Sequence, residues 1–154
     1  MAAAGYVDSL STMAVTIAAV VATVFGVLSL VHVYWALGGR TGKGAAVPQV
    51  SSRPAFVPSA FATFFVAVGL AACALLVAAT AHLVVSPLSG SWLKWLCLAL
   101  ALGLLARAVG DFRLVGFFKR IRGSAFARLD TLLYAPLCLL LSVAVFHVAT
   151  SEAL

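Results

Sequence analysis

Long apolar runs separated by short polar segments dominate the chain. Four runs are long enough to cross the hydrocarbon core of a bilayer, about 30 Å thick, as α-helices. They predict membrane spans at residues 13–37, 59–85, 92–109 and 132–149. Gly38 and Gly39 follow the first run, Pro58 precedes the second and Pro87 follows it, as is typical of helix ends. We therefore expect an all-α fold, a four-helix transmembrane bundle that forms a single membrane domain over residues 1–154.

Composition supports this class and argues against a soluble protein. The chain is 64% hydrophobic and 9% charged, whereas soluble domains are about 45–50% apolar and about 25% charged. The net charge of +6 could suggest nucleic acid. The basic residues flank apolar spans, however, and that pattern is typical of cytoplasmic loops. We expect no nucleic-acid partner.

The basic residues lie in alternate connections. The first loop contains Arg40, Lys43 and Arg53, whereas the turn after the second span contains none and Lys94 lies just beyond it. The third loop contains five more, and Arg107 lies at the end of the helix before it. The positive-inside rule then predicts cytoplasmic first and third loops, with both termini outside. We expect a multi-pass protein of the plasma membrane, which in some bacteria is the cell inner membrane.

The N-terminal segment carries Asp8 and no Lys or Arg. A cleaved secretory signal needs a basic first region and a short apolar core. The apolar run that follows is too long for such a core, so we expect the first helix to be an uncleaved span.

Polar and aromatic residues gather where the four antiparallel spans reach the predicted cytoplasmic face. The residues at that depth are His32, Tyr34, Trp35, Arg107, Asp111, Arg113, Asp130 and Tyr134. Ionisable groups are costly inside a membrane and usually face the bundle interior or a water-filled cavity. Arg107 and Asp111 are four residues apart, so they can pair on one helix face. Asp130 can cap the fourth helix or accept a hydrogen bond from an arginine.

Two interpretations of this polar cluster remain open. It can be a set of salt bridges that fixes the ends of the bundle. It can also be a binding pocket in which His32 and Asp111 handle protons, since histidine titrates near neutral pH and a carboxylate can orient it. Tyr34 and Trp35 could form a wall of that pocket, or they could belong to an ordinary aromatic belt at the membrane surface.

The segment 111–130 alternates apolar and basic residues. This pattern is typical of an interfacial element on an anionic leaflet. Lys119, Arg120 and Arg122 are the candidate contacts to lipid phosphates, which makes membrane lipids the expected partners. A basic loop that only sets the orientation would have the same composition.

Candidate redox and metal sites are weak. Cys73, Cys97 and Cys138 lie in apolar runs without metal-ligand spacing. His82 and His147 lie near the outer ends of their spans, where paired histidines can bind haem or a metal, but no cysteine or carboxylate completes a ligand set. We expect no metal and no cofactor. The chain shows no phosphate-binding loop and no hydrolase motif, so catalytic residues are unknown and an enzyme is the less favoured class.

Two segments carry a resemblance to a known family. HVYWALGG (32–39) and DFRLVGFFKRIRGSAFARLDTLLYAPLCLLL (111–141) resemble an uncharacterised family of small bacterial integral membrane proteins with four spans. The resemblance extends over nearly the whole chain. It implies four helices and a membrane location, and it implies no reaction.

Three function classes follow. The first is a membrane protein that binds a lipid-like or hydrophobic small molecule near the cytoplasmic leaflet, through His32, Trp35, Asp111 and Arg113. The second is a structural or accessory protein that acts through helix contacts with a membrane partner or in a homo-oligomer. The third, a small transporter, is least favoured because the middles of the spans contain almost no polar residues.

Overall fold

The computed structural model describes residues 2–50 and 53–151, with side chains from residue 12 onward. Its long helices are α1 (Ala2–Ala36), α3 (Ala60–Thr80), α4 (Gly90–Val109) and α6 (Ala135–Ser151). The short elements are α2 (Lys43–Ala46), α5 (Ala125–Leu129), the π-helix η1 (Asp130–Tyr134) and the antiparallel strands β1 (Gln49–Val50) and β2 (Arg53–Pro54). Because α5, η1 and α6 are continuous, the described residues contain four helical runs long and apolar enough to cross a membrane. The predicted all-α four-helix transmembrane bundle is confirmed.

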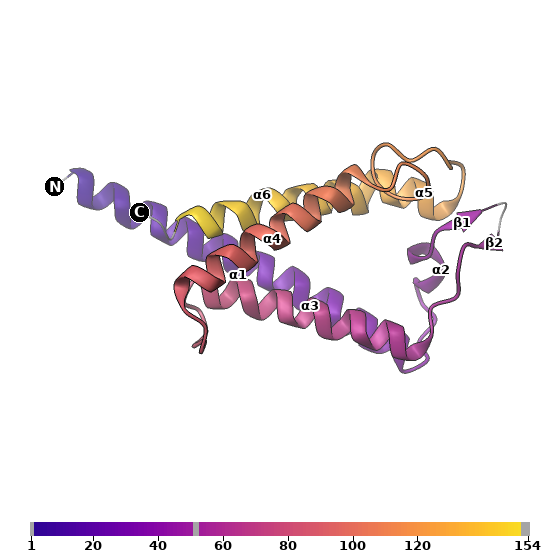
Figure 1. The fold of residues 1–154 in the computed structure, drawn as a ribbon, viewed down its shortest axis with the longest axis horizontal. Helices are drawn as coiled ribbons and strands as arrows, with labels where there is room; N and C mark the ends of the chain where they lie inside the picture. The colour runs from indigo at the N-terminus through magenta and orange to yellow at the C-terminus, as the bar shows by residue number, and fades with distance from the viewer. Residues whose placement is uncertain (1, 51–52, 152–154) are drawn as a thin grey trace.

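The bundle consists of two antiparallel helix pairs, α1 with α3 and α4 with α6 (Figure 1). A buried serine joins each pair. Ser29 Oγ donates to the carbonyl of Ala67 at 2.8 Å, and Ser142 Oγ donates to the carbonyl of Ala101 at 2.7 Å. Both acceptors are buried alanines, whose small side chains let the backbones approach closely.

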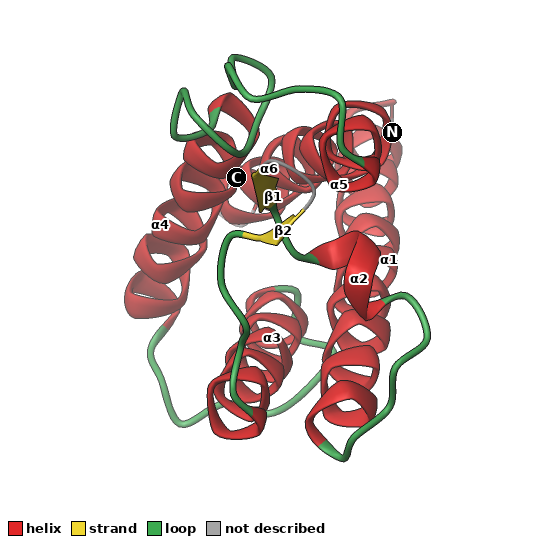
Figure 2. Ribbon diagram, turned by 90° about the vertical axis from the view of Figure 1, so that its right-hand side faces the viewer, coloured by secondary structure: helices red, strands yellow, loops and turns green. Residues whose placement is uncertain are grey.

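The hydrophobic core lies where the two pairs cross, toward the end at which α6 finishes (Figure 1). Its buried members are Ala18, Val21, Phe25, Val77, Ala81, Cys97, Ala101, Leu141, Val145, Val148 and Ala149. Toward the other end the pairs diverge, and α2 and the two-stranded hairpin lie between them (Figures 1 and 2). The first loop therefore bridges the pairs where the core does not reach.

Helix α3 ends five residues before the predicted span 59–85 because the chain turns at His82. His82 has φ 54°, its N–H donates to Ala79 O at 3.1 Å, and the Leu83 N–H donates to Ala78 O at 2.9 Å. This is the Schellman arrangement of a helix C-terminus, which usually has glycine at the left-handed position. The apolar run continues past the turn, so hydropathy alone placed the end too late.

The last helical run begins before the predicted span 132–149 and continues through Pro136. Its start is capped by Ser124, whose Oγ accepts from the Ala127 N–H at 3.0 Å. Proline has no N–H and its ring clashes with the carbonyl four residues earlier. Leu132, four residues before Pro136, lies in η1, so the wider turn there accommodates the proline ring and the helix continues.

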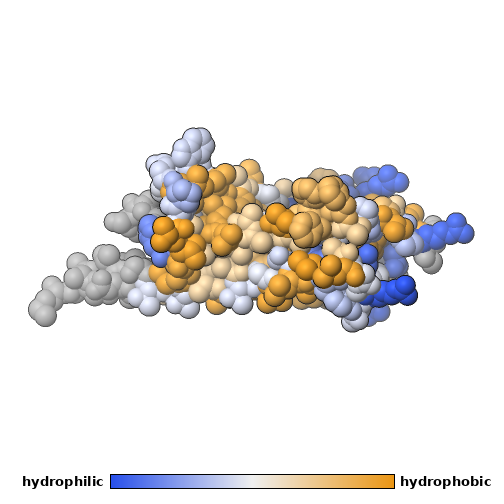
Figure 3. Space-filling view, turned by 90° about the horizontal axis from the view of Figure 1, so that it is seen from below, coloured by the Kyte–Doolittle hydropathy of each residue, from blue (hydrophilic) through white to orange (hydrophobic). Residues whose placement is uncertain are grey.

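Every Lys and Arg except Lys94 belongs to the end of the bundle where α1 and α4 finish and α3 and α5 begin, which we call the basic end. Figure 3 shows hydrophilic side chains gathered there beyond a wide apolar band over the helices. Large exposed side chains in that band include Leu30, Phe61, Phe65, Leu102 and Leu140. Such a surface fits lipid rather than water.

Candidate functional site

A buried ionic cluster at the basic end is centred on Asp130, which is fully buried. Its Oδ1 accepts from Arg107 Nη2 at 2.7 Å. Its Oδ2 accepts from Lys119 Nζ at 3.0 Å and from the Gly116 N–H at 2.7 Å. The donors come from α4 and from the 110–124 segment and the acceptor comes from η1, so the cluster joins these three parts of the chain. Buried charges in proteins are paired in this way because an unpaired charge is costly.

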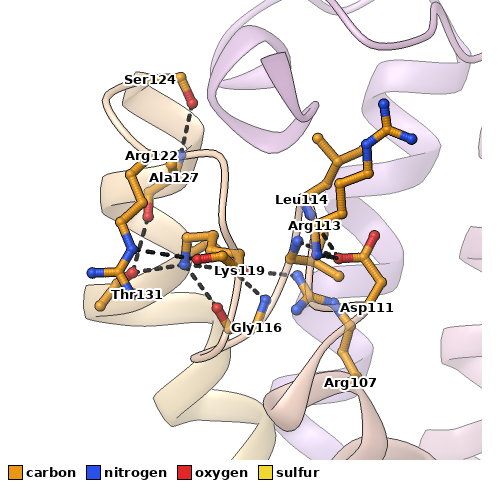
Figure 4. Close-up of polar contacts among 12 residues, drawn as sticks. Arg107, Asp111, Arg113, Leu114, Gly116, Lys119, Arg122, Ser124, Ala127 and Thr131 are labelled. Carbon is orange, nitrogen blue, oxygen red and sulfur yellow. Dashed lines mark hydrogen bonds and ion pairs between the residues drawn. The ribbon is translucent and has the colours of Figure 1, made fainter. Parts of the chain in front are cut away.

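Lys119 is buried together with Asp130, unlike its basic neighbours in sequence. Its Nζ also donates to Gly116 O at 2.9 Å and to Thr131 Oγ1 at 2.7 Å, so all three ammonium donors are used (Figure 4). The sequence pattern assigned Lys119 to lipid phosphates. That assignment is corrected, because the ammonium group is bound inside the cluster.

The cluster carries two cations and one anion. Arg107 is the less enclosed cation, with a side chain that is 34% exposed. Its Nη1 is nevertheless buried and has no hydrogen-bond partner among the described residues. Asp130 was expected to cap a helix or to accept from an arginine, and the structure shows the second arrangement.

Two glycines let the 110–124 segment close against α4. Gly110 has φ +96° and Gly116 has φ +85°, and a Cβ on either one would collide with the backbone of the other part of the loop. The Phe117 N–H donates to Ala108 O at 2.9 Å, which fixes the segment to the end of α4. This close backbone contact positions the Gly116 N–H on Asp130.

Asp111 organises the same loop and does not pair with Arg107. Its Oδ1 accepts from the N–H groups of Arg113 at 2.9 Å, Leu114 at 2.6 Å and Val115 at 3.0 Å. These hydrogen bonds lower the pKa of the Asp111 carboxyl, and the bond from the Val115 N–H has the largest effect. The predicted pair fails because α4 ends at Val109, so the four-residue helical spacing does not extend to Asp111.

A separate cavity of about 240 Å³ lies between α1, α2, α3 and the loop before α3. We call it the His32 pocket. It is lined by His32, Trp35, Lys43, Ala46, Val47, Phe56, Pro58, Ala62, Thr63 and Val66. The rings of His32 and Trp35 meet edge to face with centroids 4.9 Å apart. The pocket therefore combines an aromatic and aliphatic wall with the imidazole of His32 and the ammonium group of Lys43.

The hydrogen bond of His32 indicates which ring nitrogen carries the proton when the imidazole is neutral. Nδ1 lies 2.8 Å from the carbonyl of Leu28, and a carbonyl only accepts, so Nδ1 carries the proton. The other ring nitrogen, Nε2, has no hydrogen-bond partner in the described part of the chain. In the neutral ring Nε2 is an acceptor, and in the charged ring it becomes a donor.

The aromatic residues beside this pocket have structural partners. Trp35 Nε1 donates to Thr41 O at 2.8 Å, and Tyr34 OH donates to Thr41 Oγ1 at 3.2 Å. These bonds fold the chain after α1 back onto its last turn. Tyr134 OH donates to Ala45 O at 3.3 Å and so joins η1 to α2. Tyr34 and Tyr134 do not line the His32 pocket.

The predicted polar cluster therefore separates into three places. His32 and Trp35 line one pocket, Arg107 and Asp130 meet in the ionic cluster, and Asp111 holds its own loop. Tyr34, Asp111 and Arg113 of that cluster are exposed, and so are the predicted lipid contacts Arg120 and Arg122. Of these, Arg122 Nε donates to Lys119 O at 3.3 Å.

Sequence reasoning missed several residues of these sites. Lys43 and Phe56 lie in the first loop, and no local pattern shows that this loop folds over α1. Thr131 and Gly116 complete the bonds of Lys119. The spacing of Gly110 and Gly116 around an aspartate was the available signal for a tight loop.

Among the described residues, no group of three or more His, Cys, Asp or Glu side chains could hold a metal ion. His147 Nε2 lies 3.4 Å from Ser151 Oγ on its own helix.

Comparison with known proteins adds one match. Neither the curated proteins nor the solved structures contain a match to this chain. A family model described as "Protein of unknown function (DUF3995)" matches residues 25–145, which include the His32 pocket, the Asp111 loop and the ionic cluster. Because the match covers most of the chain and the fold has four apolar helices, this polytopic membrane protein belongs to the DUF3995 family.

Proposed function

We propose that the protein binds a small amphiphilic or apolar molecule in the His32 pocket. The observation that carries the proposal is that His32, whose Nε2 has no hydrogen-bond partner among the described residues, lines a cavity whose other walls are largely apolar. Small-molecule sites are typically apolar cavities with a few polar groups that fix orientation. A ligand with a hydroxyl or carbonyl group on an apolar body would match His32 and Lys43.

The size of the cavity limits the ligand. Its volume of about 240 Å³ is below the roughly 300–1,000 Å³ typical of ligand pockets. It therefore suits one ring or the polar head of an amphiphile rather than a complete lipid. Ala62 and Val66 are exposed on α3 beside the pocket, so the rest of a longer molecule could continue along the apolar surface of that helix.

Fluorescence of Trp35 tests this proposal directly. The variant W92F/W95F leaves Trp35 as the only tryptophan, and both replaced side chains are exposed. We expect anilinonaphthalene sulfonate, an amphiphilic fluorophore, to quench Trp35 saturably in the detergent-purified protein. Adding Ala62→Phe, which fills the pocket, should abolish the saturable component.

Ala60→Phe is the matched control, because Ala60 is an exposed alanine of α3 that does not line the pocket. It should leave the quenching unchanged. Equal quenching in the two phenylalanine variants, or quenching that never saturates in either one, would show that the probe only partitions into the detergent. That result would contradict the proposal.

We infer that the basic end faces the cytoplasm and that the protein lies in the plasma membrane. The support is the gathering of all Lys and Arg except Lys94 at one end, since cytoplasmic loops are enriched in these residues. In a variant without native cysteines, an impermeant maleimide should label Ser91→Cys on intact cells. It should label Gly44→Cys only after permeabilisation. The reverse pattern would overturn the orientation.

An accessory role and transport remain predictions from the sequence. No observation on the described residues specifically favours either one.

A further inference from the structure

A second hollow of about 230 Å³ lies on α5 and the start of η1. It is lined by Arg122, Gly123, Ala127, Arg128, Thr131 and Leu132 and shares no residue with the His32 pocket. Both arginines are exposed, and the Leu132 side chain is 73% exposed. The hollow therefore combines two accessible cations with an accessible apolar side chain.

The two arginines have no carboxylate partner in the described part of the chain. Asp130, the nearest acid in sequence, is already bound by Arg107 and Lys119. Arg122 Nε donates to Lys119 O at 3.3 Å, which anchors the start of its guanidinium group and leaves the two Nη groups available. Figure 4 shows Arg122 beside Thr131, on the opposite side of Lys119 from Arg107.

Charge and hydropathy change along one side of the helical run. Arg128 and Leu132 are four residues apart, and both line the hollow. Arg128 lies toward the basic end, whereas Leu132 lies about one turn further into the apolar band. A molecule bound here meets positive charge at its head and apolar surface beneath it.

We propose that this hollow binds an anionic phospholipid, with the phosphate held between Arg122 and Arg128 and an acyl chain over Leu132. Guanidinium groups bind phosphate through charge-assisted, often bidentate, hydrogen bonds. A zwitterionic lipid offers the same phosphate but adds a cation that the two arginines repel. The sequence predicted Lys119 as a headgroup contact, but its ammonium group is bound in the ionic cluster. In the proposed site Arg128 contacts the headgroup instead.

Lipid titration with native mass spectrometry tests the proposal. We expect the detergent-purified protein to retain phosphatidylglycerol in preference to phosphatidylcholine. Relative to a charge-matched control, R122Q/R128Q should weaken phosphatidylglycerol binding about tenfold or more, because charged hydrogen bonds are lost. R122K/R128K should recover part of the affinity, since lysine keeps the charge without the bidentate geometry.

The control is R53Q/R113Q, which removes two exposed arginines of the basic end that do not line the hollow. It should bind phosphatidylglycerol within about twofold of the unmodified protein if only local contacts matter. Equal weakening in both glutamine variants would reduce the effect to the general charge of the basic end and would overturn the site. Thermal unfolding of each variant verifies that all of them are folded.

A competition experiment distinguishes binding of a lipid from binding of free phosphate. Inorganic phosphate at the same concentration as the lipid should not displace phosphatidylglycerol, because it makes no contact with Leu132. Displacement at equal concentration would assign the site to a soluble anion and overturn the lipid proposal.

Discussion

Lys119 Nζ lies 3.0 Å from Asp130 Oδ2, and the two side chains are 1% and 0% exposed. The lysine belongs to a basic run, KRIR, whose two arginines are exposed. Its burial means that the 110–124 segment is folded onto α5 and η1 rather than lying on the membrane surface as a uniformly charged strip. The position of one neighbouring arginine also depends on Lys119, since Arg122 Nε donates to the Lys119 carbonyl.

Removing the anion of this cluster should destabilise the protein more than removing one cation. Asp130→Asn leaves Arg107 and Lys119 as uncompensated charges, and breaking a buried pair in this way costs about 3–5 kcal/mol. Lys119→Met leaves Asp130 bound by Arg107 and by the Gly116 N–H, so it should cost about 1–3 kcal/mol. Reversible unfolding in mixed detergent and SDS micelles measures both free energies.

The double variant D130N/K119M supplies the control. Its cost should be smaller than the sum of the two single costs, because both replacements act on one network. Costs that add would mean that Lys119 and Asp130 do not interact energetically.

Gly110 and Gly123 have almost the same backbone angle but different surroundings. Their φ angles are +96° and +97°, yet a Cβ at Gly110 meets the backbone of Val115 and Gly116, whereas a Cβ at Gly123 meets nothing within 4 Å. Gly123→Ala should therefore cost only the strain of a left-handed residue, about 1–2 kcal/mol. Gly110→Ala should cost clearly more, since the backbone must also move apart.

Gly116→Ala is expected to behave like Gly110→Ala, because its Cβ would meet the backbone at Gly110. Thermal unfolding in detergent ranks the three variants. If Gly123→Ala were as destabilising as the other two, strain alone would explain the costs and the close backbone contact would have no energetic role.

Acid should loosen the Asp111 loop. The charged carboxylate is the form that accepts the three N–H groups, so the folded loop has the lowered pKa and binds a proton less readily than the unfolded chain. The stabilisation is complete above the ordinary aspartate pKa of about 3.9 and is lost as the pH falls through the lowered value. Hydrogen exchange at the amides of Arg113, Leu114 and Val115, corrected for intrinsic rates, should therefore accelerate below about pH 4.

Asp111→Asn is the control for that titration, because an amide accepts hydrogen bonds without titrating. Its loop should exchange at a corrected rate that does not change with pH over this range. A pH dependence as steep as that of the unmodified protein would assign the effect to another group.

The candidate sites were only partly predictable. The depth argument correctly brought Arg107 and Asp130 to one end of the bundle, and the structure pairs them. It could not show that His32 and Asp111 belong to different sites. Depth in the membrane gives only the position along the bundle axis and does not give the position around that axis. The partner of Arg107 depended on where α4 ends, and a hydrogen-bonded loop capped by Asp111 leaves no periodic pattern.

The sequence by itself determined the class of fold and the distribution of charge between its ends. Both follow from segment-level quantities, namely the length of each apolar run and the loop in which each basic residue lies. Tertiary structure decided which charges are buried, which pair and which remain available. Lys119 and Arg122 look alike in the sequence, but the close contact of Gly110 with Gly116 directs one into the ionic cluster and leaves the other exposed. That difference depends on contacts between segments distant in sequence, which local hydropathy does not record.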